Sequence, residues 1–195
     1  MKKMILIAAP PAAGKNYVSE LICRALGDVA YLDKDDLGIL LRRSFDLCGE
    51  ERNMDGGFYL QNLREAEYET LFDLAFSALR FSDTVVVNAP LLKEVRDEAY
   101  MRHLKTRTAQ LGAELVLVWV VASDGACYER MQSRASARDT GKLARWEEYG
   151  RGIDRTPPRG LEDTGAVDVL FAFDNESAER AEIALGALLE ALEAR

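Results

Sequence analysis

The sequence contains few of the residues that build disulfide frameworks or metal centres. Among its 195 residues are three cysteines, Cys23, Cys48 and Cys127, and a single histidine, His103. The cysteines are odd in number and widely spaced, and no CxxC pair is present, so neither a disulfide framework nor a zinc site is expected. This cysteine usage is typical of a reducing compartment and predicts a cytoplasmic protein.

Basic charge and long hydrophobic runs are also scarce. The 25 lysines and arginines are outnumbered by 33 aspartates and glutamates, which gives a formal net charge of −8 at pH 7. Proteins that bind nucleic acid through its phosphates normally carry a basic surface, so nucleic acid is not an expected partner. No apolar run approaches the roughly 20 residues that span a bilayer, and no membrane association is predicted.

Strand-like and helix-like segments alternate along the whole chain. The predicted strands are the apolar or β-branched runs Met4–Ala8, Val29–Leu32, Thr84–Val87, Glu114–Ala122 and Val169–Phe173. Helical segments separate them, and neither a repeat nor a linker divides the chain. The order predicts one α/β domain, residues 1–195, with a doubly wound parallel sheet of five strands. Gly150–Asp168 carries Gly, Pro and Arg and is predicted as a mobile loop.

A phosphate-binding loop pattern follows the first predicted strand. The pattern G-x-x-x-x-G-K-[ST] holds a phosphate with backbone N–H groups and a helix N-terminus, while its lysine contacts the β- and γ-phosphates. Here the segment reads Ala9-Pro10-Pro11-Ala12-Ala13-Gly14-Lys15-Asn16. Its spacing and its place between strand and helix predict ATP binding. The candidate nucleotide-binding residues are Pro11, Ala12, Ala13, Gly14, Lys15, Asn16, Tyr17 and Arg130.

Two residues of this loop depart from the pattern. Ala9 replaces the first glycine, and Asn16 replaces the Ser/Thr whose hydroxyl would ligate Mg²⁺. The Asn16 carbonyl is a hard oxygen that could face Mg²⁺ directly or through water. The alternative interpretation is an ordinary strand-to-helix turn with an exposed lysine.

Five segments extend the pattern over most of the chain: Met4–Asn16, Leu32–Leu37, Asn62–Leu71, Val85–Pro90 and Arg130–Asp139. On these residues the chain resembles the P-loop small kinases, the group with polynucleotide kinase domains, chloramphenicol phosphotransferase-like enzymes and zeta-toxin-like kinases. The resemblance implies a five-stranded parallel sheet, a mobile helical lid over about residues 125–160, and transfer of the ATP γ-phosphoryl group to a hydroxyl.

The resemblance also implies a general base after the second strand. Lys34-Asp35-Asp36 matches the R-D-D pattern of polynucleotide-kinase-like proteins, so this role is assigned to Asp35. A carboxylate at the end of a strand beside the phosphate loop can orient an acceptor hydroxyl and take its proton. Asp33, closer to the strand, is the alternative base, and Asp36 could instead be a helix N-cap.

The third predicted strand ends at Asn88. Related kinases tend to carry an aspartate there, which holds a metal-bound water. An amide oxygen can accept a hydrogen bond but supplies no negative charge. Asn16 and Asn88 are therefore weak candidates for the magnesium side of the site.

Arg130, Arg134 and Arg138 are spaced four residues apart, so they share one face of a predicted helix. Guanidinium groups on one face could neutralise charge that develops during phosphoryl transfer. The resemblance places lid arginines in this region, and Arg134 and Arg138 join Lys15 and Asp35 as predicted catalytic residues. The alternative is a solvated helix face.

Several further residues carry weaker signals. Arg42, Arg43, Arg64 and Tyr68 are candidates for the acceptor pocket, and Phe173–Glu176 is a candidate adenine-binding segment. The predicted function is an ATP-dependent, magnesium-requiring kinase whose acceptor is a small molecule with a hydroxyl. The alternatives are a non-catalytic nucleotide-binding protein with a degenerate loop and a polynucleotide 5′-hydroxyl kinase.

Overall fold

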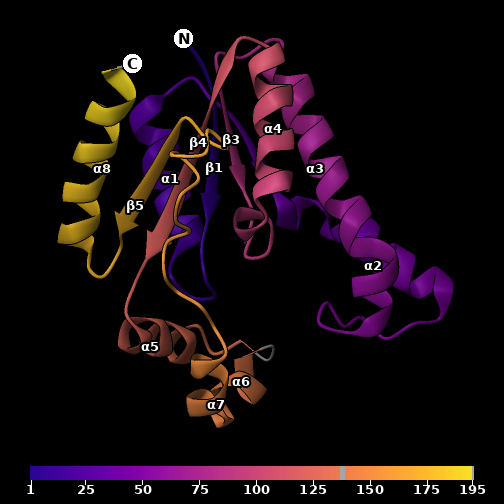
Figure 1. The fold of residues 1–195 in the computed structure, drawn as a ribbon. Coiled ribbons are helices and arrows are strands. Elements are labelled where there is room, and N and C mark those ends of the chain that lie inside the picture. The colour runs from indigo at the N-terminus through magenta and orange to yellow at the C-terminus, as the bar shows by residue number, and fades with distance from the viewer. Residues whose placement is uncertain (137–138, 195) are drawn as a thin grey trace.

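A computed structural model describes residues 1–136 and 139–194. Five strands, all parallel, form one sheet in the order β2-β3-β1-β4-β5 (Figure 1). They are β1 (Lys2–Ala8), β2 (Ala30–Asp33), β3 (Thr84–Asn88), β4 (Ala113–Val121) and β5 (Val169–Asp174). The predicted fold class is thereby confirmed.

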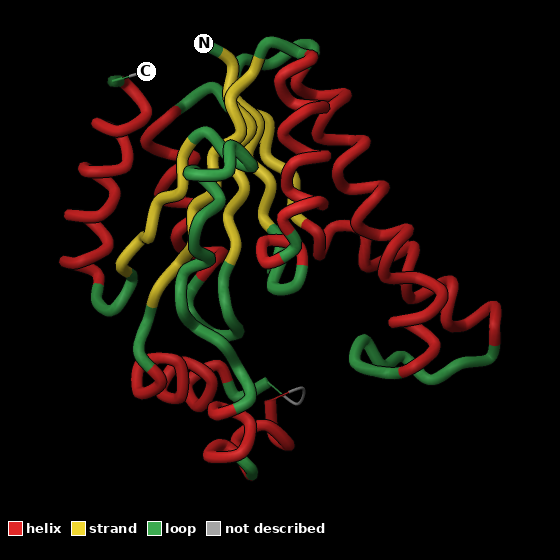
Figure 2. The backbone as a smooth tube through the Cα atoms, viewed as in Figure 1, coloured by secondary structure: helices red, strands yellow, loops and turns green. Residues whose placement is uncertain are grey.

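Helices cover both faces of this sheet. The helices are α1 (Lys15–Leu26), α2 (Gly38–Cys48), α3 (Arg64–Leu79), α4 (Glu98–Gln110), α5 (Asp124–Arg134), α6 (Thr140–Ala144), α7 (Trp146–Arg151) and α8 (Ala178–Glu193). Short turns of helix are η1 (Lys34–Leu37), the π-helical η2 (Tyr59–Leu63) and η3 (Glu94–Arg96). Figures 1 and 2 show α1 and α8 on one face, α3 and α4 on the other, and α5–α7 beyond one end of the sheet.

Strand β4 shows why the central strands are continuously apolar. Side chains alternate between the two faces of a strand, so Leu117 and Trp119 pack in the cluster with α3 and α4. Val118 and Val120 pack in the opposite cluster with α1 and α8. All four are fully buried. A strand that is covered on both faces needs apolar residues at every position.

The segment predicted as a mobile loop, Gly150–Asp168, differs from that expectation in its second half. Leu161, Ala166 and Val167 are buried in the cluster with α3 and α4. The Asp168 carboxylate accepts a hydrogen bond of 2.7 Å from the backbone N–H of Leu115. These contacts fasten the segment to β4, and composition alone did not reveal them.

The position of β1 decides where a ligand can bind. It lies between β3 and β4, next to the point where the strand order changes direction. Parallel sheets bind ligands at such a point, beyond the carboxyl ends of their strands. The phosphate-loop pattern follows β1 at this end. Within the described residues, every helix is too short or too polar to cross a membrane.

We expect Leu117→Ala to lower the free energy of unfolding by about 2–5 kcal/mol, because it leaves a cavity in a fully buried layer. Urea unfolding followed by circular dichroism measures the change. Ile183→Ala is the control, since this α8 side chain is exposed and its loss should cost less than about 0.5 kcal/mol. Equal costs for both variants would contradict the described packing.

Candidate active site

The segment that follows β1 forms a tight loop before α1. Gly14 has a φ of +91°, and a Cβ at this position would overlap the side-chain amide of Asn175. That amide nitrogen donates a hydrogen bond of 2.7 Å to the carbonyl of Ala13. Glycine is therefore required at position 14 both by the backbone conformation and by the close approach of Asn175.

The first turn of α1 has backbone N–H groups available to a ligand. Gly14 is the N-cap, and no side chain there accepts a hydrogen bond from the helix N-terminus. The first turn also contains no acidic residue. Because the first N–H groups of a helix have no partner within it, and carry partial positive charge, this end favours an anion.

Lys15 places its charge at the same end of the sheet. Its Nζ lies 2.5 Å from Oδ1 of Asn88 and 3.3 Å from Oδ1 of Asn16. Burial lowers the pKa of Lys15, and the carboxylates of Asp33 and Asp35 oppose this shift. The structure thus brings together the lysine, both amides and both aspartates that the sequence singled out.

Asn88 is the fully buried centre of this group. Its Oδ1 accepts hydrogen bonds from Lys15 and, at 3.0 Å, from the Ser19 hydroxyl of α1. Its Nδ2 lies 2.5 Å from Oδ2 of Asp33 and 2.8 Å from the Tyr31 hydroxyl. Asp33 and Asn88 are neighbours in the register of β2 and β3. One amide on β3 therefore connects this strand to α1 and β2.

The two candidate bases lie in different surroundings. Oδ1 of Asp33 accepts a hydrogen bond of 2.9 Å from the backbone N–H of Asp35 and thereby caps η1. Asp36 caps neither η1 nor α2, whose N-cap is Leu37, so that alternative is wrong. The side chain of Asp35 is exposed beside the group, whereas Asp33 is partly buried within it.

An ion pair beneath η1 fixes the position of both aspartates. Lys34 is buried, and its Nζ lies 2.7 Å from Oε1 of Glu67 on α3. Tyr59 of η2 donates a hydrogen bond to the other carboxylate oxygen of Glu67. The sequence showed Lys34 only as part of a motif, and its burial depends on a partner 33 positions away.

The candidates for the acceptor pocket are dispersed. Arg64 pairs with Glu94 at 2.6 Å, and its guanidinium carbon lies 4.7 Å from the centre of the Tyr68 ring. Arg42 and Arg43 are exposed on α2. The positive charge of Arg64 is therefore neutralised by a neighbouring carboxylate.

The predicted row of arginines has specific partners. Arg130 donates to the backbone carbonyls of Ala13, Asn175 and Glu176, at 3.2, 2.6 and 3.2 Å, and so joins the loop to the turn after β5. Arg134 pairs with the buried carboxylate of Asp139 at 2.6 Å. Arg138 lies outside the described residues. Tyr17 is exposed on the first turn of α1.

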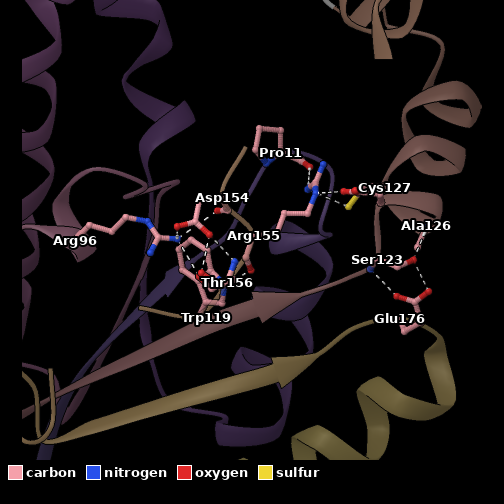
Figure 3. Close-up of polar contacts among 11 residues, drawn as sticks. Pro11, Arg96, Trp119, Ser123, Ala126, Cys127, Asp154, Arg155, Thr156 and Glu176 are labelled. Carbon is pink, nitrogen blue, oxygen red and sulfur yellow. Dashed lines mark hydrogen bonds and ion pairs between the residues drawn. The ribbon is translucent and has the colours of Figure 1, made fainter. Parts of the chain in front are cut away.

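One arginine beside the loop was missed by the sequence analysis. Nη1 of Arg155 lies 3.4 Å from the carbonyl oxygen of Pro11 (Figure 3). Its own carbonyl accepts a hydrogen bond of 3.1 Å from the indole of Trp119, which is fully buried. No motif marked this position, because Arg155 lies near the end of the predicted lid, within the segment Gly150–Asp168 that was interpreted only as a mobile loop.

Comparison with protein families identifies the class of this chain. A family model described as an AAA domain matches residues 4–156, and the chain belongs to this family. None of the curated protein sequences matches the chain.

Solved structures share the fold along nearly the full length. A candidate kinase from Chloroflexus aurantiacus is 19% identical, with a TM-score of 0.66 over 99% of this chain and 97% of that one. A gluconokinase from Sinorhizobium meliloti is 19% identical, with a TM-score of 0.58 over 98% and 95%. The APS kinase of Mycobacterium tuberculosis is 21% identical, with a TM-score of 0.53 over 98% of both chains. The resemblance to P-loop small-molecule kinases is confirmed at the level of the fold.

We expect Glu67→Ala to cost about 3–5 kcal/mol of stability, because it leaves Lys34 buried without its carboxylate. Chemical unfolding measures the change. Glu69→Ala is the matched control on the same helix, since Glu69 is exposed. Should the two variants unfold at the same urea concentration, the ion pair would not be what holds η1 against α3.

Proposed function

We propose that this protein is an ATP-dependent kinase that transfers the γ-phosphoryl group to a hydroxyl of a small molecule. The observation that carries this proposal is the position of Lys15, beside an N-terminus of a helix and close to Asp33 and Asp35. A fixed cation for the phosphates next to carboxylates that can orient a hydroxyl is the combination that phosphoryl transfer requires.

The nucleotide phosphates would bind on the loop from Pro11 to Asn16. Gly14 keeps the backbone free of side chains there, and Arg130 holds the loop against the turn after β5. The APS kinase, whose fold this chain shares, was solved in complex with AMPPNP. This supports ATP as the nucleotide class for the present chain.

The oxygen donors near Lys15 fit a magnesium ion that arrives with the nucleotide. Within the described residues no group of three or more His, Cys, Asp or Glu could hold a metal by itself. Asp33 would supply a carboxylate oxygen and Asn16 an amide oxygen. The amide oxygen of Asn88, by contrast, already accepts hydrogen bonds from Lys15 and Ser19. Mg²⁺ commonly takes one or two carboxylates together with substrate phosphates, and when bound it neutralises phosphate charge.

The surroundings of the two aspartates favour Asp35 as the general base. Asp33 already accepts hydrogen bonds from Asn88, Tyr31 and the N–H of Asp35. These bonds hold Asp33 in place and leave about one acceptor position for a ligand. The exposed carboxylate of Asp35 can instead receive an acceptor hydroxyl.

Helices α5–α7 would close over the bound nucleotide as a lid of about residues 125–160. They lie beyond the ends of the strands, and Lys142 of α6 reaches to 3.9 Å from Asp55 in the connection between α2 and α3. Arg134 would take part in catalysis from this lid, as would Arg138. A closed lid excludes water from the transferred phosphoryl group.

A second candidate is a nucleotide-binding protein without turnover. It is favoured by Asn88, whose neutral amide occupies the buried position where related kinases tend to carry an aspartate. The two candidates share nucleotide binding and differ in phosphoryl transfer.

We expect wild-type protein to bind ATP, and Lys15→Ala to weaken this binding about 10- to 100-fold, as for a lost charge-assisted hydrogen bond. Isothermal titration calorimetry with and without Mg²⁺ measures both. Lys2→Ala, at the opposite end of β1, should leave the affinity unchanged. If the wild type binds no nucleotide, both candidate functions fail.

We expect Asp35→Asn to lower the rate of phosphoryl transfer about 10²- to 10⁴-fold while ATP affinity stays the same, because only the general base is lost. ADP release over a panel of sugars, polyols, nucleosides and amino alcohols measures this rate. Asp36→Asn is the control on the adjacent, exposed carboxylate. ATP binding without ADP release on any acceptor would favour the non-catalytic candidate.

A further inference from the structure

Three consecutive residues, Asp154, Arg155 and Thr156, cross the carboxyl edge of the sheet, and we call them the strap. Arg96 of η3 donates to the carbonyls of Asp154 and Thr156 at 3.2 and 2.9 Å. Trp119 of β4 donates to the carbonyl of Arg155 at 3.1 Å. The backbone of the strap is therefore fixed from both the β3 side and the β4 side, as Figure 3 shows.

The side chain of Arg155 extends from the strap into the space between the phosphate loop and α5. Nη1 lies 3.4 Å from the carbonyl oxygen of Pro11 and 3.5 Å from Sγ of Cys127. Nε donates to the carboxylate of Asp124. The guanidinium carbon lies 5.9 Å from the centre of the Trp146 ring. The side chain is only 14% exposed.

The guanidinium of Arg155 has hydrogen-bonding capacity that the protein does not use. Its Nη2 is buried and has no hydrogen-bond partner among the residues that the structure describes. A buried donor without a partner is rare, since losing water without gaining a bond costs free energy. A planar guanidinium matches phosphate oxygens in shape and charge, and the loop beside it is the proposed phosphate site.

The arginines of the predicted row do not offer the same capacity in the described part of the chain. Both terminal nitrogens of Arg130 already donate hydrogen bonds to backbone carbonyls, three in all. Arg134 is paired through two nitrogens with the buried Asp139. Arg155 contacts the loop at Pro11, whereas Arg130 contacts it at Ala13.

The pair between Arg155 and Asp124 can be exchanged for another anion. The side chain of Asp124 is 63% exposed, so water screens its attraction for the guanidinium. Asp124 also lies at the first position of α5, where the helix N-terminus itself stabilises a carboxylate. Asp124 therefore does not depend on Arg155 as a partner.

We propose that Arg155 is a phosphate-binding residue, and that its guanidinium exchanges Asp124 for the phosphates of a nucleotide bound on the loop. Asp124 then acts as a competitor that keeps the guanidinium oriented before binding. This inference rests on the proposed nucleotide binding. It adds to the site a cation from the end of the lid segment, which is joined through Arg96 to the turn after β3.

Calorimetric titration of ATP and of inorganic tripolyphosphate tests this proposal on four proteins. In Arg155→Gln we expect both affinities to fall by the same factor, about 10- to 100-fold, because the lost contact is with phosphate. Asp124→Asn removes the competitor, so ATP should bind at least as tightly as to the wild type. Arg159→Gln, an exposed arginine four residues further along, should match the wild type.

The outcomes separate this proposal from the proposed function. Failure of the wild type to bind ATP would remove the function itself. Wild-type ATP affinity in Arg155→Gln, or a loss for ATP without the same loss for tripolyphosphate, would overturn the role of Arg155. If Asp124→Asn weakened ATP binding as much as Arg155→Gln, the pair would be structural, and the proposal would be wrong.

Discussion

The buried amide of Asn88 is the interaction on which the site depends. Its oxygen holds Lys15 and Ser19, and its nitrogen lies against Asp33 and Tyr31. An aspartate here would bring a second negative charge to within hydrogen-bond distance of Asp33. The amide avoids this repulsion because it presents a donor to the carboxylate and an acceptor to the lysine. The negative charge of the site therefore comes from β2 rather than from β3.

The fold could be predicted because its central strands are covered on both faces. Segments such as Leu115–Val120 are apolar at every position, and such a run between helices leaves little choice but a parallel sheet. The phosphate loop could be predicted as well, since its spacing is local. The pairing of β1 with β3, and of β3 with β2, then follows from the fold, and this brings Asp33, Asn88 and Lys15 together.

The contacts that sequence reasoning missed join residues that lie far apart in the chain. Lys34 pairs with Glu67 on α3, and Arg155 contacts the carbonyl of Pro11, which lies 144 positions earlier in the chain. Neither pair has a spacing that any pattern describes. Leu161 was missed for a different reason, because glycine, proline and arginine around it suggested an irregular segment, and a single leucine does not reveal that it is buried. The arginines spaced four apart show the converse case, since periodicity predicted a shared face but not the separate partners of Arg130 and Arg134.

The close approach of Gly14 and Asn175 links the two ends of the chain in a way that extends to its evolution. Any side chain at position 14 would occupy the place of the Asn175 amide, and that amide in turn holds Ala13. The backbone conformation at position 14 also excludes other residues, so the Asn175 amide can approach this closely only while glycine is kept there. The turn after β5 is therefore inherited together with the phosphate loop.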